Sequence, residues 1–147
     1  TKEQNLWKVT GLKMIEQKQT IKKKGKPVEI TSLRPADSDN WYLSIGQGMG
    51  KTLTQADEKQ VYTLSDRGTF IKYKYGKKPA LELDVLCEGD EGLANPYGII
   101  PVNPAKHPAV KNDLAVKFAE WLVSEKGQKL IGDYRLEGKQ LFYPDAI

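Results

Sequence analysis

Residues 62–69, with the sequence YTLSDRGT, place an arginine and two hydroxyl side chains within a few positions. The pattern predicts a strand that turns into a helix, with Ser65 and Asp66 as candidates for the N-cap. Arg67 offers a planar fork of donors that matches an oxyanion, and the hydroxyls of Thr63 and Ser65 would add neutral donors. This set could bind a small anion. A simpler interpretation is that Ser65 caps the helix and Arg67 pairs with Asp66 or a nearby acid.

The glycine-rich segment IGQGMGKT, residues 45–52, also follows a strand-like run and precedes a predicted helix. Small residues such as Gly48 let backbone amides approach a ligand, and the following helix would present its positive end there. Met49 lies in the same turn. The segment fits equally well a tight strand-to-helix turn that holds no ligand.

Residues 46–52 also raise the alternative of nucleotide binding. A phosphate loop has the form Gly, four residues, then Gly-Lys-Ser/Thr, so that successive amides wrap the phosphates. Counting back from Gly50 puts Ile45 where the first glycine is required, and the spacing from Gly46 is one residue short. ATP binding that depends on Lys51 would favour this alternative.

Other reactive side chains do not indicate catalysis. The single cysteine, Cys87, lies in an apolar run, and the single histidine, His107, lies in a proline-rich stretch. One cysteine forms neither a disulfide framework nor a zinc site. Glu88, Asp90 and Glu91 are more simply explained as an acidic turn than as a catalytic carboxylate pair. We therefore expect a protein that is not an enzyme and that holds no metal and no cofactor.

The 147 residues are 39% hydrophobic and 29% charged, a composition typical of one globular domain. No run approaches the roughly 18 apolar residues of a membrane span. The net charge of +4 is concentrated in two lysine-rich stretches, near residues 18–26 and 72–78. In the second, Tyr73 and Tyr75 alternate with lysines, which leaves nucleic-acid binding as an alternative. A solvated basic loop is the more common outcome, and we expect no nucleic-acid partner.

Hydrophobic spacing predicts several helices, and strand-like runs lie between them. Helices are expected at residues 6–15 (one, or two broken at Gly11), 50–60, from the cap at 65–66 to Gly76, 114–122 and 128–134. Strand-like or apolar runs are expected at residues 41–45, 61–64, 81–86 and 97–102. Residues 16–40 read as a loop with a short strand at 27–30, and the tail at 141–143 should pack back. This alternation predicts an α/β fold with a largely parallel sheet.

These motifs together resemble the periplasmic tungstate-binding proteins, the solute-capturing components of ABC importers. The resemblance rests on WY at 41–42, GQGMG at 46–50, YTLSDRGT at 62–69, EGD at 88–90, NPYG at 95–98 and VNP at 102–104. The ending WLVSEKGQKLI, residues 121–131, is similar to the closing helices of type II solute-binding proteins in general.

The resemblance implies an α/β fold of the type II periplasmic-binding-protein kind, in which two lobes joined by a hinge close on an oxyanion. Residues 1–87 would form the second lobe, with a lysine-rich insertion at about 17–39. Residues 88–97 would be the crossover, and residues 98–147 would return into the first lobe. The family's early hydroxyl-rich segments have no match here, so the chain is expected to start after them, and a missing N-terminal segment of the same protein is a further candidate partner.

The resemblance also implies a function and a site. The ligand would be tungstate, with molybdate as the other candidate, held by hydrogen bonds. Arg67 would carry the anion contact, with Thr63 and Ser65 beside it and Gly48 and Met49 close by. The partners would be the oxyanion and a membrane permease, and the location periplasmic or extracytoplasmic, associated with the membrane through the transporter. The alternatives are the nucleotide-binding loop at residues 46–52 and a binding lobe recruited as a ligand sensor.

Overall fold

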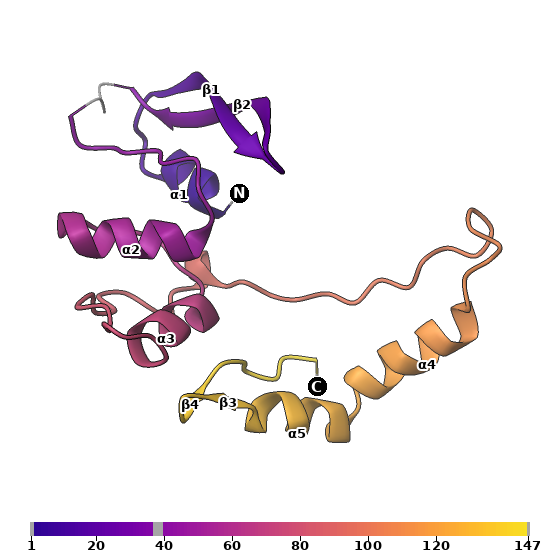
Figure 1. Ribbon diagram of the computed structural model, residues 1–147. Helices are drawn as coiled ribbons and strands as arrows, with labels where there is room; N and C mark the ends of the chain where they lie inside the picture. The colour runs from indigo at the N-terminus through magenta and orange to yellow at the C-terminus, as the bar shows by residue number, and fades with distance from the viewer. Residues whose placement is uncertain (1, 37–39, 147) are drawn as a thin grey trace.

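The computed structural model describes residues 2–36 and 40–146, so residues 37–39 of the expected insertion lie outside the described residues. Figure 1 shows the chain running from a compact N-terminal part along an extended segment to a C-terminal helical part. The elements are α1 (Lys2–Val9), β1 (Met14–Lys23), β2 (Lys26–Pro35), α2 (Met49–Lys59), α3 (Arg67–Tyr75), the 3-10 turn η1 (Glu91–Leu93), α4 (Asn112–Leu122), α5 (Glu125–Asp133), β3 (Arg135–Leu136) and β4 (Lys139–Gln140).

Strands β1 and β2 form a long antiparallel hairpin, in register from Met14 opposite Pro35 to Lys23 opposite Lys26. The predicted loop over residues 16–40, with one short strand, is therefore wrong, and so is the helix continued through Met14. Partly buried and exposed residues alternate along β1, which is the period of a strand with one covered face. The turn residues Lys24 and Gly25 both have positive φ, which suits the twist of a two-residue hairpin turn.

Helices α2 and α3 pack together and form the small core of the N-terminal part. The buried apolar side chains are Leu53 and Ala56 on α2, Ile71 on α3, and Leu81 beyond α3. The helices approach closely because Gly50 of α2 has no Cβ, and a Cβ there would collide with the Tyr73 ring and hydroxyl. The predicted helices at residues 50–60 and up to Gly76 are confirmed.

The segment after α3 is fastened to both helices through its backbone. Asp57 of α2 accepts hydrogen bonds from the amides of Glu82 and Leu83, at 2.7 and 3.1 Å. Lys74 of α3 donates to the Leu83 carbonyl at 2.8 Å and pairs with Asp84 at 3.1 Å. The apolar run at residues 81–86 thus lies against the helix pair without becoming a strand.

The strand-like runs at residues 41–45, 61–64 and 97–102 likewise form no strand, so the expected parallel sheet is not formed over residues 2–36 and 40–146. The strands found there are antiparallel, β1 with β2 and β3 with β4. A parallel strand has no local partner, because its neighbour arrives only after a long crossover. In contrast, β1 pairs with the strand that follows it directly in sequence, so the hairpin can form from local residues alone.

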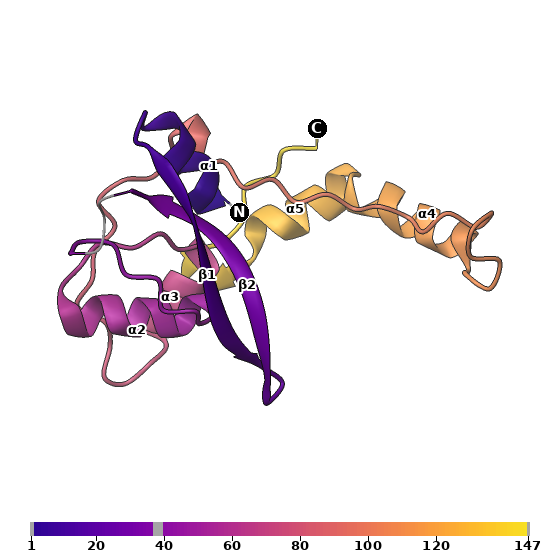
Figure 2. The same cartoon turned by 90° about the horizontal axis from the view of Figure 1, so that it is seen from above.

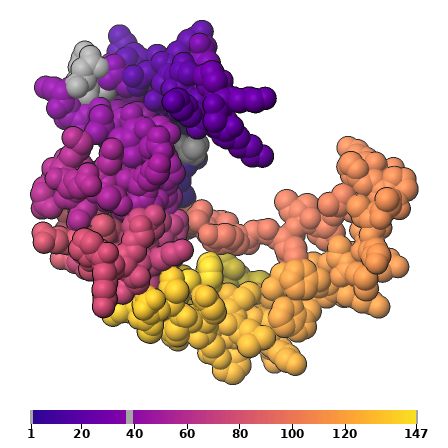
Figure 3. All heavy atoms as spheres, viewed as in Figure 1, coloured from indigo at the N-terminus to yellow at the C-terminus, as the bar shows by residue number. Residues whose placement is uncertain are grey.

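The C-terminal part is built from α4 and α5, which confirms both predicted helices. Ser124 caps α5 by accepting a hydrogen bond from the Gly127 amide at 3.3 Å. The tail packs back as expected, with the Phe142 ring 5.8 Å from that of Tyr97 and 6.4 Å from that of Tyr134. Figure 3 shows the resulting open outline, in which the extended segment and these helices form an arm. Within the described chain, no helix combines the length and apolarity of a membrane span.

Candidate anion site at the starts of helices α2 and α3

A contact between Met49 and Asp66 brings the two glycine- and hydroxyl-bearing turns together. The Asp66 amide donates a hydrogen bond to the Met49 sulfur at 3.1 Å, across 17 residues of sequence. Met49 is the first residue of α2, and Asp66 is the N-cap of α3. The positive ends of the two helices therefore lie next to each other, which favours a negative ligand at this place.

The start of α2 offers backbone donors to a ligand. Its N-cap is Gly48, in an extended conformation, and no side chain caps the helix. The amides of Lys51 and Thr52 turn inward to the Gly48 carbonyl, at 3.0 and 3.1 Å. The preceding amides of the first turn have no carbonyl within a regular helix, so they can serve an external acceptor. Lys51 is turned aside, since its ammonium donates to the Gln47 side chain at 3.3 Å.

The start of α3 is capped by its own carboxylate. Asp66 accepts a hydrogen bond from the Thr69 amide at 2.7 Å and another from the Thr69 hydroxyl at 2.8 Å. The N-cap is therefore Asp66 and not Ser65, the other residue that the sequence offered for that role. This cap fixes the direction in which α3 begins, and with it the position of Arg67 as the first helical residue.

Arg67 is held on two sides. Its Nη2 lies 2.6 Å from Glu88 Oε2, and its guanidinium lies 5.4 Å from the centre of the Tyr143 ring. The side chain of Arg67 is 37% exposed and that of Glu88 is 58% exposed. A guanidinium has five N–H donors, so donors other than the one facing Glu88 are available to a ligand. The first contact joins the start of α3 to the predicted crossover at Glu88, and the second joins it to the C-terminal tail at Tyr143.

The two predicted hydroxyls differ in their surroundings. Ser65 donates to the Asp66 carbonyl at 3.0 Å, which ties its hydroxyl to the adjacent backbone. Thr63 is exposed in the extended run before α3. The structure thus brings Gly48, Met49 and Arg67 into one neighbourhood, while neither hydroxyl contacts the other four predicted residues through a hydrogen bond within the described chain.

The hairpin supports the glycine-rich turn from one side, a role that the sequence did not indicate. Gln19 of β1 donates to the Ser44 hydroxyl at 3.0 Å. Gly46 has φ +61, and a Cβ added there would lie 2.9 Å from a methyl carbon of Ile21. Gly46 is therefore needed both for its backbone conformation and for the close approach of β1. In the sequence, the only indication of this packed strand face is that Gln19 and Ile21 alternate with Lys18 and Lys22.

An aromatic cluster anchors the other end of the same segment. The Trp7 ring of α1 lies 5.7 Å from that of Trp41 and 5.8 Å from that of Tyr42. Glu3 accepts hydrogen bonds from the Tyr42 hydroxyl at 2.7 Å and from the Trp7 indole at 3.2 Å. Burial, with the hydrogen bond to Glu3 and the charge of that carboxylate, raises the pKa of Tyr42 above its ordinary value. Tyr42 therefore stays protonated and keeps α1 attached to the run that leads to Gly46.

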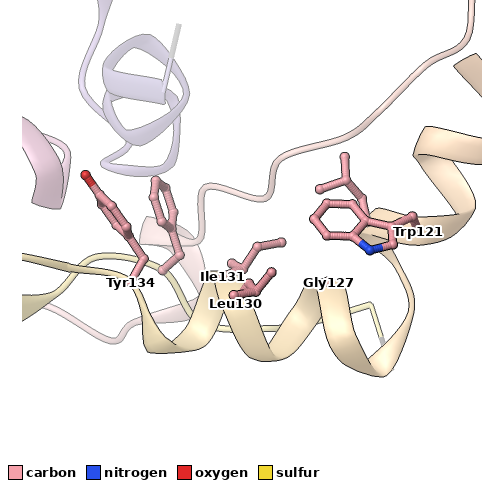
Figure 4. A pocket seen from close by; sticks show the side chains of 7 residues that line it. Trp121, Gly127, Leu130, Ile131 and Tyr134 are labelled. Atoms are coloured by element: carbon pink, nitrogen blue, oxygen red, sulfur yellow. The ribbon is translucent and has the colours of Figure 1, made fainter.

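Two hollows lie on the molecule, one far from these residues in sequence and one next to them. Figure 4 shows an apolar one of about 290 Å³ on α4 and α5, lined by Trp121, Leu122, Gly127, Leu130, Ile131, Tyr134 and Phe142. Its lining has almost no polar groups, so it suits apolar side chains and not an oxyanion. A polar hollow of about 400 Å³ lies beside the glycine-rich turn, lined by Ile45, Gln47, Lys51, Thr54, Gln55 and Glu58. Over the described residues, no three His, Cys, Asp or Glu side chains are grouped to hold a metal ion.

Comparison with known proteins places the fold in a family. Residues 1–126 match the family described as a PBP superfamily domain, and the chain belongs to that family. A solved tungstate-binding protein, TupA from Desulfovibrio alaskensis G20, superposes with a TM-score of 0.69 at 48% identity. The match covers 78% of this chain and 46% of that one. The predicted α/β fold of the type II periplasmic-binding-protein kind is confirmed.

Curated relatives have names that also specify the binding of tungstate or another anion. The tungstate-binding protein TupA of Peptoclostridium acidaminophilum is 47% identical over 109 residues, which are 73% of this chain and 37% of that protein. A Haloferax volcanii protein, provisionally named an ABC transporter anion-binding protein, is 47% identical over 115 residues, 75% of this chain and 32% of its own length. The chain thus spans about a third of these relatives. The resemblance to tungstate-binding proteins is confirmed, and the relatives do not support the nucleotide-binding alternative.

Proposed function

We propose that this chain is part of a solute-binding protein of an ABC importer, and that it contributes to capturing an oxyanion, tungstate in the first place and molybdate as the second candidate. The proposal is supported by relatives of 47–48% identity whose names specify tungstate binding. The structural observation that carries it is the Met49–Asp66 contact, which sets two helix starts side by side next to Arg67.

The chemistry of the site suits a tetrahedral dianion. Arg67 would supply charge and charge-assisted hydrogen bonds, and the uncapped first turn of α2 at Gly48 and Met49 would supply neutral amide donors. Thr63 and Ser65 would complete the set if their hydroxyls turn to the ligand. Charge alone does not separate tungstate from sulfate, so selectivity would come from a dehydrated pocket of matching size.

The finer assignments follow from the same proposal. The protein would work outside the cytoplasm and deliver its ligand to a membrane permease, and it would be a binding protein without catalytic activity or resident cofactor. Residues 1–87 would belong to one lobe, 88–97 to the crossover and 98–147 to the other lobe. The pairing of Arg67 with Glu88 supports this division, because it joins the proposed site to the proposed crossover.

Titration calorimetry with tungstate, molybdate and sulfate tests the choice of ligand. The proposal expects saturable binding of tungstate, weaker or comparable binding of molybdate, and at least about a hundredfold weaker binding of sulfate, a difference of roughly 3 kcal/mol. Equal affinity for sulfate and tungstate would contradict a selective site. Binding of ATP that is lost on Lys51→Ala would contradict the proposed class of ligand.

A further inference from the structure

The net charge of the hairpin equals the net charge of the whole protein. From Met14 to Pro35 it has six basic and two acidic side chains, a net charge of +4. The whole chain has 23 basic and 19 acidic residues and the same net charge of +4, which leaves 17 of each sign elsewhere. The remainder of the molecule is therefore neutral overall, although it includes the second lysine-rich stretch at residues 72–78.

Most of this charge is at the tip of the hairpin, around the turn. Lys22, Lys23, Lys24 and Lys26 are all exposed. Figures 2 and 3 show the hairpin end projecting beyond the body of the molecule. Nearer the base, Lys18 pairs with Glu29 at 3.7 Å, whereas the four tip lysines form no ion pair within residues 2–36 and 40–146. A partner could therefore reach them without displacing an acidic side chain of the hairpin.

The second lysine-rich stretch is different, because two of its four lysines make contacts within the protein. Lys74 pairs with Asp84, and the Lys77 ammonium lies 3.6 Å from the centre of the Tyr73 ring. In contrast, three of the tip lysines occupy positions that lower the stability of the hairpin. Lys23 and Lys26 stand directly opposite each other, and like charges in that position are destabilising. Lys24 has φ +50, a conformation in which side chains other than glycine, asparagine and aspartate are disfavoured.

We propose that this lysine tip, Lys22 to Lys26, is a docking surface for a membrane that carries anionic lipid. Clusters of four to eight basic residues beside a membrane helix or on an amphipathic helix attract anionic lipid headgroups, and the tip presents four such charges. Every charge at the tip is a lysine, a compact point charge without the planar fork by which arginine recognises a particular carboxylate. Such a set suits many phosphate groups spread over a lipid surface better than a single acidic groove on a protein. Pro27 and Val28, both exposed beside the lysines, would add apolar contact.

The tip lysines lie on both faces of the hairpin, which fits a docking mode in which the tip points at the membrane. Successive residues of a strand point to opposite faces, so Lys22 and Lys23 lie on different sides of the ribbon. A flat protein partner would meet one face and leave half of the charge unused. On the body side of the tip, Gln19 contacts Ser44 and Ile21 lies against Gly46, so docking at the tip leaves these contacts in place.

Sedimentation with lipid vesicles tests the proposal on the full 147-residue chain. One set of vesicles contains equal parts of phosphatidylcholine and phosphatidylglycerol, and the other contains phosphatidylcholine alone. The test variant is Lys22→Gln/Lys23→Gln/Lys26→Gln. The control variant Lys106→Gln/Lys111→Gln/Lys117→Gln removes the same charge from exposed positions in the C-terminal part. Circular dichroism and a tungstate titration of each variant show whether the fold and the proposed site are retained.

We expect the wild type and the control variant to bind the anionic vesicles at low salt and neither to bind the neutral ones. The hairpin variant should bind roughly a hundredfold more weakly, at about fivefold for each lysine. Binding should also fall steeply as salt is raised, because exposed charges are screened. Equal losses in the two variants, or no binding of the folded wild type to anionic vesicles, would overturn the proposal. The second result would favour an acidic protein as the partner of the hairpin. Neither result depends on whether tungstate binds.

Discussion

The sulfur of Met49 and the backbone amide of Asp66 are joined by a hydrogen bond of 3.1 Å that links the starts of α2 and α3. Each of the two turns, taken alone, has the sequence of an ordinary turn before a helix. Together they bring an uncapped helix start and the arginine at position 67 to the same place. The proposed anion site depends on this juxtaposition more than on any single motif.

Replacing Met49 with leucine should weaken ligand binding while changing stability little. Leucine keeps a similar volume at this 40% exposed position, so the free energy of unfolding should fall by less than about 1.5 kcal/mol. Loss of the sulfur acceptor frees the Asp66 amide, and we expect tungstate affinity to drop by roughly twofold to tenfold. Calorimetry and urea denaturation measure the two effects. Met14→Leu, in β1, is the control, and an equal loss of affinity in that variant would refute the assignment.

Replacing Glu88 with glutamine should strengthen the binding of a dianion. The Glu88 carboxylate lies 2.6 Å from the Arg67 guanidinium and competes with a negatively charged ligand for it. Because both side chains are well exposed, the pair is worth at most about 1 kcal/mol, and we expect up to roughly fivefold tighter tungstate binding. Glu91→Gln removes a nearby carboxylate that has no such contact and serves as the control. Weaker binding in Glu88→Gln would mean that Glu88 positions Arg67 for the ligand.

Replacing Gly50 with alanine should destabilise the protein, although alanine is the better helix former. A Cβ at Gly50 would overlap the Tyr73 side chain where α2 and α3 meet. Overpacking of this kind costs about 1–3 kcal/mol. Urea denaturation should show that loss, and the loss should disappear when Gly50→Ala is made in a Tyr73→Ala background. Gly98, whose Cβ would meet nothing within 4 Å, is the control position. A stabilised Gly50→Ala variant would show that the two helices can separate freely.

The partly buried hydroxyl of Tyr42 should make stability depend on alkaline pH. Its pKa is raised in the folded protein, chiefly by burial and then by the hydrogen bond with Glu3. The stabilisation is fully present below the unfolded value of about 10 and is lost as pH rises through the folded value. The advantage of the wild type over Tyr42→Phe in unfolding free energy should therefore shrink above about pH 10. A gap that stays constant with pH would contradict this, and Tyr62→Phe, at an exposed tyrosine, is the control.

The helices could be predicted from sequence because their apolar spacing and caps are local. The strands could not, for two different reasons. The runs at residues 41–45 and 97–102 have strand composition but no partner within the described residues, and a parallel pair needs a distant one. The hairpin was missed because its inward face includes Gln17 and Gln19 instead of a continuous apolar row. Its turn also has Lys24 where asparagine or glycine is the usual signal.

The two turns that form the candidate site could be predicted from sequence, and the contacts between them could not. Sequence indicated Arg67 and the glycine-rich segment, because a fork of donors and small residues before a helix have a clear chemical meaning. It could not show that Asp66 caps α3 while Ser65 turns to the adjacent carbonyl, since either residue type fills that role. The pairing of Arg67 with Glu88 spans 21 residues, and no local pattern specifies it.

Calorimetric titration of the Arg67→Ala variant with tungstate tests the central claim most directly, with Arg135→Ala as a variant that removes the same charge elsewhere. If Arg67 holds the anion, its loss should weaken binding by at least about tenfold to a hundredfold, to the point where no heat is detected. The circular dichroism spectrum should not change, because Arg67 is partly exposed and lies outside the core. Arg135→Ala should bind as the wild type does. Unchanged tungstate affinity in a folded Arg67→Ala variant would contradict the proposed site.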